Sequence, residues 1–298
     1  MSVDDLRATP GRVGVWSGDL RGARRGEVRD AASELDALGF RALWVPGLDG
    51  RDVFDDVAEL ERAAPHSMVV IGVLGIWGHD PAEVGEQLHA LDRDHGPRTI
   101  VGFGVSSPDS ARAAGEDYGD PITTVARYLD RLDDAPEPVP AARRLLGALG
   151  PKMVDLGAHR AGGLHPFLVT PEYVVRARAQ VGPGPLLAPH QAVVLETDPD
   201  RARNAARAAL ADVIASPAYQ RNLRRIGFTD GDLVPGGSDH LIDTVVAWGT
   251  VDHISARVAA HLAAGADHVA LHVVGGHRPL PLPQWRELAA FLPHPPAG

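Results

Sequence analysis

Residues 67–81 read SMVVIGVLGIWGHDP, in which an apolar run rich in β-branched residues is followed by a short turn and a proline. An unbroken apolar run of this kind is typical of a parallel strand that is buried on both faces. Proline is favoured in the first turn of a helix, and helical periodicity continues over residues 81–94. The stretch therefore predicts one β-strand followed by one α-helix.

The same strand-then-helix unit recurs along the chain. Eight strands are predicted, over residues 12–18, 41–47, 67–77, 99–107, 143–150, 163–170, 186–196 and 268–276. Helices are predicted between them, over residues 27–38, 51–63, 81–94, 122–133, 151–161, 171–180, 199–226, 238–264 in two pieces, and 282–292. Eight such units, with no G-x-G-x-x-G fingerprint at the start of a helix, favour a (β/α)8 TIM barrel over an open doubly wound sheet.

The connection between the seventh and eighth strands is far longer than one helix requires. We expect an insertion of extra helices over about residues 197–250, ending in the loop TDGDLVPGGSD at residues 229–239, which is a candidate lid. The whole chain, residues 1–298, is expected to form a single barrel domain.

Composition excludes several classes of function. The net charge of −10 is spread along the chain without a cluster of lysines and arginines, so nucleic acids and anionic membranes are unfavourable partners. No apolar stretch approaches the ~20 residues that span a bilayer, and the acidic N-terminal segment does not resemble a secretory signal, so a cytoplasmic protein is expected. The absence of cysteine excludes disulfides, thiolate metal sites and cysteine nucleophiles.

A (β/α)8 barrel carries its functional groups at the carboxyl ends of the strands. The residues predicted there are Ser17, Asp19, Gly47, Trp77, His79, Asp80, Ser106, Ser107, Gly150, Lys152, Thr170, His190, His272 and His277. They provide no pair of carboxylates at the end of the fourth strand, no evident three-ligand metal spacing and no G-x-S-x-G elbow. A bound cofactor that carries the reactive atom is therefore favoured, and no metal is expected.

Several of these features allow two interpretations from the residues alone. The Gly150–Pro151 turn at the start of a helix is either a tight turn or an anion site, to which Lys152 would add a positive charge. Gly72 and Gly75 either relieve crowding inside the barrel or mark a bulge against a flat ligand. Ser107 is either a helix N-cap or a functional hydroxyl. The strand histidines are either ligands or satisfied core residues.

The motifs in chain order are more specific than any of them alone. They are the glycine-containing third strand, VGFGVSS (101–107), LGALGPKMVDLGAHRAGGLHPFLVTPE (146–172), PLLAPHQAVVLETDPDRAR (185–203) and GSDHLIDTVVAWG (237–249). Together they resemble the luciferase-like monooxygenase superfamily, specifically its F420-dependent oxidoreductase branch. The resemblance covers about residues 12–276. It implies a barrel with an insertion after the seventh strand, a homodimer, and coenzyme F420 or, alternatively, FMN in the mouth, with its phosphate near strands 5 and 6.

The resemblance also implies which residues bind the cofactor. A non-proline cis peptide behind the ring is expected at Gly72–Val73, and further ring contacts at Gly104, Val105 and Ser106. The phosphate-binding turn corresponds to Ala148, Leu149 and Gly150, with Lys152 and Met153 beside it. Gly163 belongs to the same set of cofactor-binding positions, and His165 corresponds to a position inside the barrel near the ring.

Three mouth positions depart from the pattern of the family. Gly47 stands where similar proteins usually carry an acidic residue, Ser107 where they carry histidine or glutamate, and His190 where they carry glutamate. The usual acid/base assignment therefore cannot be copied. His79 and His190 are the candidates for proton transfer, and Ser107 is the candidate that orients a polar group of the substrate.

The expected activity is hydride transfer between F420 and a small organic substrate, as C=C or C=N reduction or as alcohol oxidation. Two alternatives remain open at this point. One is an FMN-dependent luciferase-like monooxygenase, and the other is a non-catalytic homologue that binds a cofactor or ligand without turnover.

Overall fold

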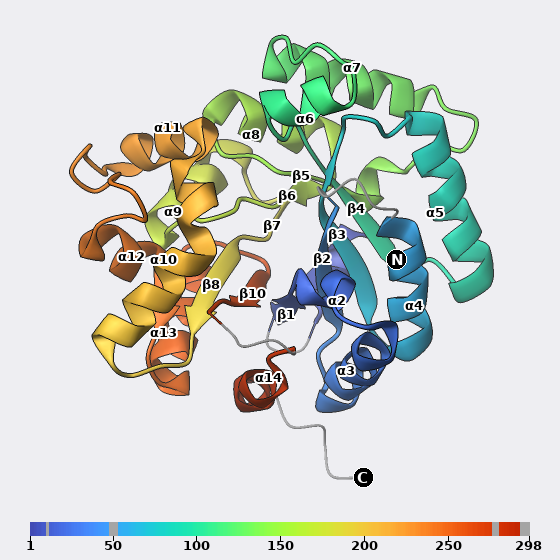
Figure 1. Cartoon of the computed structure of the whole chain (residues 1–298). Helices are drawn as coiled ribbons and strands as arrows, with labels where there is room; N and C mark the ends of the chain where they lie inside the picture. Colours follow the sequence, from blue (N-terminus) through green and yellow to red (C-terminus); the bar gives the residue numbers. More distant parts are fainter. Residues whose placement is uncertain (10–11, 48–52, 276–279, 293–298) are drawn as a thin grey trace.

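A computed structural model describes residues 1–9, 12–47, 53–275 and 280–292 of the chain (Figure 1). Ten strands form one parallel sheet in the order β7-β6-β5-β4-β3-β2-β1-β10-β8-β9. They are β1 Val13–Trp16, β2 Ala42–Gly47, β3 Met68–Gly75, β4 Thr99–Gly104, β5 Arg144–Leu146, β6 Gly163–Leu164, β7 Leu186–Leu187, β8 His190–Val194, β9 Val246–Trp248 and β10 Val269–Val273. Each of the eight predicted strand ranges contains a strand, which confirms the predicted alternation.

The sheet curls into a ring that is closed by one bent segment. β7 pairs with β6, and β8, only two residues further along the chain, pairs with β10. The two residues between β7 and β8 form hydrogen bonds with the strands on either side. Ala188 N donates to Leu164 O of β6, and Ala270 N of β10 donates to Pro189 O. The predicted seventh strand over 186–196 is thus one strand interrupted at Pro189, since proline has no N–H to continue a ladder.

The helices cover the outside of the ring (Figure 1). They are α1 Val3–Arg7, α2 Asp19–Gly22, α3 Arg25–Leu38, α4 Val53–Ala63, α5 Pro81–His95, α6 Pro108–Ala113, α7 Pro121–Asp133, α8 Pro151–Arg160, α9 Pro171–Val181, α10 Pro199–Ala215, α11 Pro217–Ile226, α12 Asp239–Val245, α13 Val251–Ala263 and α14 Leu282–Leu288. Short 3-10 turns lie at Ala141–Arg143 and Ala289–Phe291. Proline opens many of these helices, as the sequence predicts.

Large aromatic side chains fill the interior of the barrel. Trp44 on β2 is fully buried and stacks between His165 and His268, with ring centroids 4.5 and 5.6 Å away. Below this layer, Val3 and Leu6 of α1 join the interior cluster, and the carbonyl of Leu6 bonds to the His268 ring. The short helix α1, which the sequence did not predict, therefore closes the amino-terminal end of the barrel.

The insertion differs from the prediction in two places. The expected helix over 199–226 is two helices, because Pro217 forces the preceding Ser216 into an extended conformation with ψ of 131°. Residues 246–248, expected to be helical, form strand β9, which extends the sheet beside β8. The insertion has its own core, in which α10, α11, α12 and β9 pack together, and this core holds the insertion against the barrel.

Candidate active site

The side chain of Val73 on β3 packs against two glycines of β4, Gly102 and Gly104. The Gly72–Val73 peptide is cis, as the family resemblance implies, and the pairing with β4 shifts register between Ile71 and Leu74. A Cβ placed on Gly104 would lie 2.7 Å from Val73 Cγ2, and one on Gly102 would lie 3.0 Å from Val73 Cγ1. The half-buried Val73 side chain can therefore sit here only because both positions on β4 lack a side chain.

The interior leaves no room for a side chain at position 72 either. A Cβ on Gly72 would lie 2.8 Å from Trp44 Cε3 and 3.3 Å from the His165 ring. The glycine at 72 therefore relieves crowding inside the barrel, and it also belongs to the bulge that presents Val73. The crowding interpretation of Gly72 is confirmed, and the contact of the bulge with a flat ligand stays a prediction.

The turn after β4 is tied to the end of β3. The Trp77 indole Nε1 donates to the Val105 carbonyl, and the Trp77 ring lies 5.7 Å from Tyr118. Ser106 has a φ of +53°, a left-handed conformation that costs energy for a residue with a side chain. Ser107 is the N-cap of α6, since its hydroxyl accepts from Ser110 N at 3.2 Å. The N-cap interpretation of Ser107 is confirmed.

His79 and Asp80 do not form an acid/base pair. Asp80 caps α5 by accepting from Ala82 N, and it also pairs with Arg131. His79 Nδ1 lies 2.8 Å from the Gly75 carbonyl, to which it donates. The ring of His79 is thereby anchored at the end of β3 with Nε2 as its other hydrogen-bonding atom.

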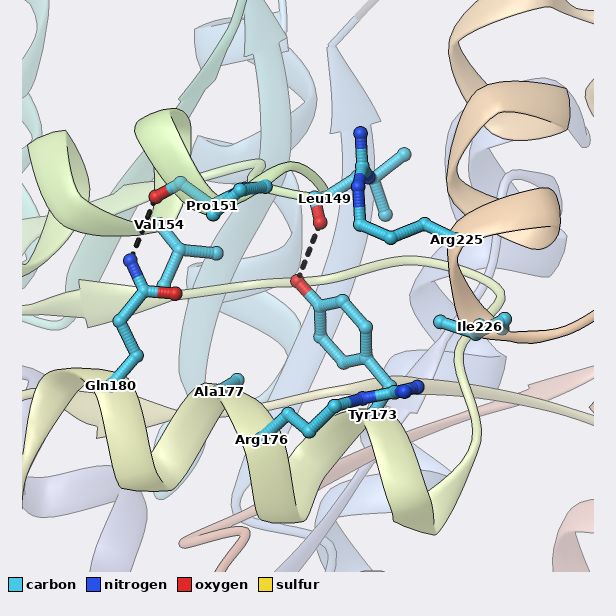
Figure 2. Close-up of a pocket in the computed structure, with 9 residues that line it drawn as sticks. All are labelled: Leu149, Pro151, Val154, Tyr173, Arg176, Ala177, Gln180, Arg225 and Ile226. Carbon is cyan, nitrogen blue, oxygen red and sulfur yellow. Dashed lines mark hydrogen bonds between the residues drawn. The ribbon is translucent and has the colours of Figure 1, made fainter.

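The turn after β5 is held from below by Tyr173 (Figure 2). The Tyr173 hydroxyl on α9 lies 3.0 Å from the Ala148 carbonyl and 3.2 Å from the Leu149 carbonyl. Burial raises the pKa of Tyr173, so its hydroxyl remains a neutral donor. The Tyr173 hydroxyl thus occupies these two carbonyls and holds the turn in place at the start of α8.

A cationic side chain from the insertion overhangs the same turn. Arg225 on α11 lies with Nη2 3.6 Å from the place that a Cβ on Gly150 would occupy, and Gly150 is the N-cap of α8. A cavity of about 170 Å³ opens beside it, with Arg225, Arg176 and Tyr173 in its lining (Figure 2). Hydrogen bonds from Thr123 lower the pKa of Asp120, and the positive charge of the exposed Lys152 lowers it further.

The sequence prediction missed Arg225, Arg176 and Tyr173. Met153, which it included, is buried in the core, and Ala148 is buried as well. Gly163 lies at the amino-terminal start of β6, where a Cβ would come within 2.4 Å of the Leu186 carbonyl. This glycine permits close strand pairing at the opposite end of the strands from the mouth, so we leave it out of the candidate site.

His165 lies inside the barrel, as the resemblance implies. Its Nδ1 lies 2.7 Å from the Ala188 carbonyl, and among the described residues its buried Nε2 has no partner. Burial lowers the pKa of His165 to about 4, so the ring is neutral. Gly47 ends β2, where a Cβ would lie 3.0 Å from both Ile71 and Leu74, so a side chain at this position requires these neighbours to shift.

His190 and His272 form a pair between β8 and β10. His190 is the first residue of β8, not a residue of its carboxyl end as predicted, whereas His272 lies near the carboxyl end of β10. His190 Nε2 lies 2.9 Å from His272 Nδ1. His190 is 1% exposed and stacks on Phe167 with centroids 3.5 Å apart, whereas His272 is half-buried. Trp16 lies against both rings and donates its indole N–H to the Gly72 carbonyl. The pair thus lies next to the Val73 segment across Trp16.

The remaining predicted mouth residues are mostly structural. Ser17 is buried, and its hydroxyl accepts from Asp19 N; Thr170 is the N-cap of α9. His277 lies outside the described residues. In the part of the chain that the structure describes, no group of three or more histidines and carboxylates is placed to hold a metal ion. Over the same residues, no helix is both long and apolar enough to cross a membrane.

Comparisons with known proteins give the same fold at low sequence identity. No protein-family model matches the chain, and no curated protein matches its sequence. An F420-dependent tetrahydromethanopterin reductase from Methanopyrus kandleri is 15% identical with a TM-score of 0.70, over 94% of this chain and 97% of that one. The chain shares the barrel fold of this reductase.

Two further solved structures share this barrel fold. An F420-dependent secondary alcohol dehydrogenase, solved with an F420–acetone adduct, is 13% identical with a TM-score of 0.68, over 88% of this chain and 92% of that one. The oxygenating constituent of 3,6-diketocamphane monooxygenase from a plasmid of Pseudomonas putida, solved with FMN, is 14% identical with a TM-score of 0.63, over 93% and 95%. Solved structures with this barrel fold thus include one with F420 and one with FMN.

Proposed function

We propose that the protein is an F420-dependent oxidoreductase that transfers a hydride between the deazaflavin and a small organic substrate. The observation that carries the proposal is the turn at Ala148–Gly150, where the start of α8 lies beneath Arg225. A helix start combined with an overhanging guanidinium favours a phosphate group. When bound, F420 supplies a carbon that accepts or donates the hydride.

The cavity at this turn fits the end of a larger ligand. Its volume of about 170 Å³ is below the roughly 300 Å³ at which complete ligand sites usually begin. The rest of the cofactor would extend from the turn along β4 and β5 to Val73. There the half-buried Val73 side chain, seated over Gly102 and Gly104, offers an apolar surface against which one face of a flat ring can pack.

The charge at the turn favours F420 over FMN. Lys152, Arg176 and Arg225 lie around the start of α8 in a chain whose net charge is −10. FMN ends in one phosphate, whereas F420 continues from its phosphate into a chain of carboxylates. Several cations at one turn stabilise the longer anion more, because each additional negative charge finds a partner.

Polar side chains of the protein would transfer the proton and orient the substrate. We propose His79 and His190 for the proton and Ser107 for orienting a polar group of the substrate. His79 retains Nε2 for this role, since only Nδ1 is bonded to Gly75. His190 is too deeply buried to meet a substrate directly, so it would act through His272. Ser107 already caps α6, which leaves its hydroxyl proton for a ligand or for Ser110.

Parallel titrations with F420 and FMN test the proposal. The fluorescence of each cofactor is followed as the protein is added, under the same buffer and salt. We expect F420 to bind more tightly than FMN. Tighter binding of FMN would instead support an FMN-dependent monooxygenase, and binding of neither would refute a cofactor site at this mouth. If F420 binds but a panel of alcohols does not reduce it, and a panel of enones does not oxidise its reduced form, the chain is a binding homologue.

A further inference from the structure

The half-buried His272 is the member of the histidine pair that can meet a molecule in the mouth. Its partner His190 is fully buried, with Phe167 stacked on one face and the edge of Trp16 against it. His272 Nδ1 is occupied by His190 Nε2 at 2.9 Å. Among the residues that the structure describes, His272 Nε2 has no hydrogen-bond partner, and this atom is the one left for a ligand.

The hydrogen bond between the rings allows only two arrangements of protons. Burial lowers the pKa of His190 well below its usual value and that of His272 to about 3, so both rings are neutral. After burial, the titratable groups that disfavour a charge on His190 are three other histidines, His272, His165 and His261. In a neutral pair, either His190 donates and His272 carries its proton on Nε2, or His272 donates and His190 carries its proton on Nδ1.

The surroundings of His190 Nδ1 decide between them. This atom is buried and has no partner within the described part of the chain. Buried N–H groups without an acceptor are rarer in folded proteins than buried acceptors without a donor. This favours the arrangement in which His190 Nε2 donates to His272, and His272 carries its own proton on its other ring nitrogen, Nε2.

The position of His272 is fixed relative to the Val73 segment. Its ring lies 4.3 Å from the Trp16 ring, and Trp16 Nε1 donates to the Gly72 carbonyl at 2.8 Å. Trp16 thus links the histidine to the peptide that presents Val73. An N–H group held in this way lies beside the surface on which we place the cofactor ring.

We propose that His272 is a catalytic residue whose neutral Nε2–H donates to the carbonyl oxygen or imine nitrogen of an uncharged substrate, and that His190 is the positioning residue that fixes this tautomer. The inference rests on the proposed function. As the substrate carbon accepts a hydride, the electron pair of its C=O or C=N bond moves onto the heteroatom. The His272 N–H stabilises that charge, and a proton from solvent, passed on through His79, completes the alcohol or amine.

An uncharged substrate follows from the residues around the pair. Gly47 at the end of β2 and Ser107 at the start of α6 carry no charge, and His190 is neutral. Trp16 and Phe167 add aromatic surface. A neutral donor in such surroundings offers no compensation for burying a carboxylate or phosphate of the substrate.

The tautomer can be measured on the protein without cofactor. Nitrogen-15 spectra of histidine-labelled protein are recorded between about pH 6 and 8, and the His272 signals are assigned as those lost in His272→Gln. We expect a neutral His272 ring protonated at Nε2 at every pH. A proton on Nδ1, or a ring that becomes cationic in this range, overturns the proposal.

Two variants of His190 test its positioning role. His190→Phe removes the donor and keeps an aromatic ring against Phe167, so His272 should become a mixture of tautomers. His190→Gln supplies an amide N–H in place of the imidazole N–H and should restore the Nε2–H tautomer. If His272 keeps a single Nε2–H tautomer in His190→Phe, His190 does not position it.

Substrate class is tested with two ketones as probes. In the protein loaded with F420, cyclohexanone should shift the His272 Nε2–H signal, and the anionic ketone pyruvate should leave it unchanged. A shift with pyruvate, or none with cyclohexanone up to its solubility limit, overturns the assignment. Failure of the proposed function is distinguishable, because it would appear in the F420 titration while the tautomer of His272 is read without cofactor.

Discussion

Replacing Arg225 by glutamine removes the cation that overhangs the α8 start. The guanidinium nitrogens Nη1 and Nη2 lie 3.7 and 3.6 Å from the place of a Cβ on Gly150, which is within reach of an anion bound at the turn. A hydrogen bond to a charged group contributes about 1.5–3 kcal/mol, so we expect F420 to bind roughly 10- to 150-fold more weakly. The effect should shrink at high salt because Arg225 is exposed.

Arg224→Gln is the matched control. Arg224 is the preceding residue of α11, is also exposed, and pairs with Asp230 at 2.9 Å instead of facing Gly150. Cofactor fluorescence titrations at low and high salt compare the two variants with the unaltered protein, and thermal unfolding verifies that all three are folded. Equal losses of affinity in both variants, or none in Arg225→Gln, would refute the placement of the anion at this turn.

Three further predictions concern the glycine under Val73, the turn after β5 and the buried carboxyl group of Glu61. Gly104→Ala places a Cβ 2.7 Å from Val73 Cγ2, and we expect a loss of about 1–3 kcal/mol in urea unfolding together with weaker F420 binding; unchanged binding would show that the ring does not pack on Val73. Tyr173→Phe removes the donor to Ala148 and Leu149 and should cost about 1–3 kcal/mol of stability while also weakening F420 binding; a loss of stability alone would separate the turn from the cofactor. Burial raises the pKa of Glu61 to about 7, so the folded state holds this proton more tightly than the unfolded state does, and stability should fall by on the order of 3 kcal/mol as the pH rises from about 4.5 to 7. Urea unfolding against pH should show that this component of the slope is absent in Glu61→Gln, and an identical slope in both proteins would contradict the shift.

The sequence predicted the parts of the site that depend on local pattern. Apolar runs and helix-opening prolines located the strands, and the Gly150–Pro151 turn was recognised because a helix start has the same chemistry wherever it occurs. The N-cap role of Ser107 was readable for the same reason, since the serine precedes a proline and a helical pattern. Pro217 was a readable signal too, and the break it makes between α10 and α11 was overlooked.

The missed residues reach the site from distant segments. Arg225 lies 75 positions beyond Gly150 and approaches it only because the insertion packs as a unit against the barrel. His190 and His272 are 82 residues apart, so their contact depends on β8 pairing with β10. Gly163 was misplaced for the converse reason: its motif is local, but its side of the barrel is set by the pairing of β6 with β7. In each case the three-dimensional packing of distant segments, and not the residue type, decides whether the residue lies at the site.

The central claim is that a flat, phosphorylated hydride carrier lies in the mouth with its anionic end at the turn after β5. A crystal structure of the protein soaked with F420 tests it most directly. We predict a ring packed on Val73 and a phosphate within hydrogen-bond distance of Arg225 and of the backbone at Gly150. A phosphate bound elsewhere, with this turn free of ligand, would contradict the account.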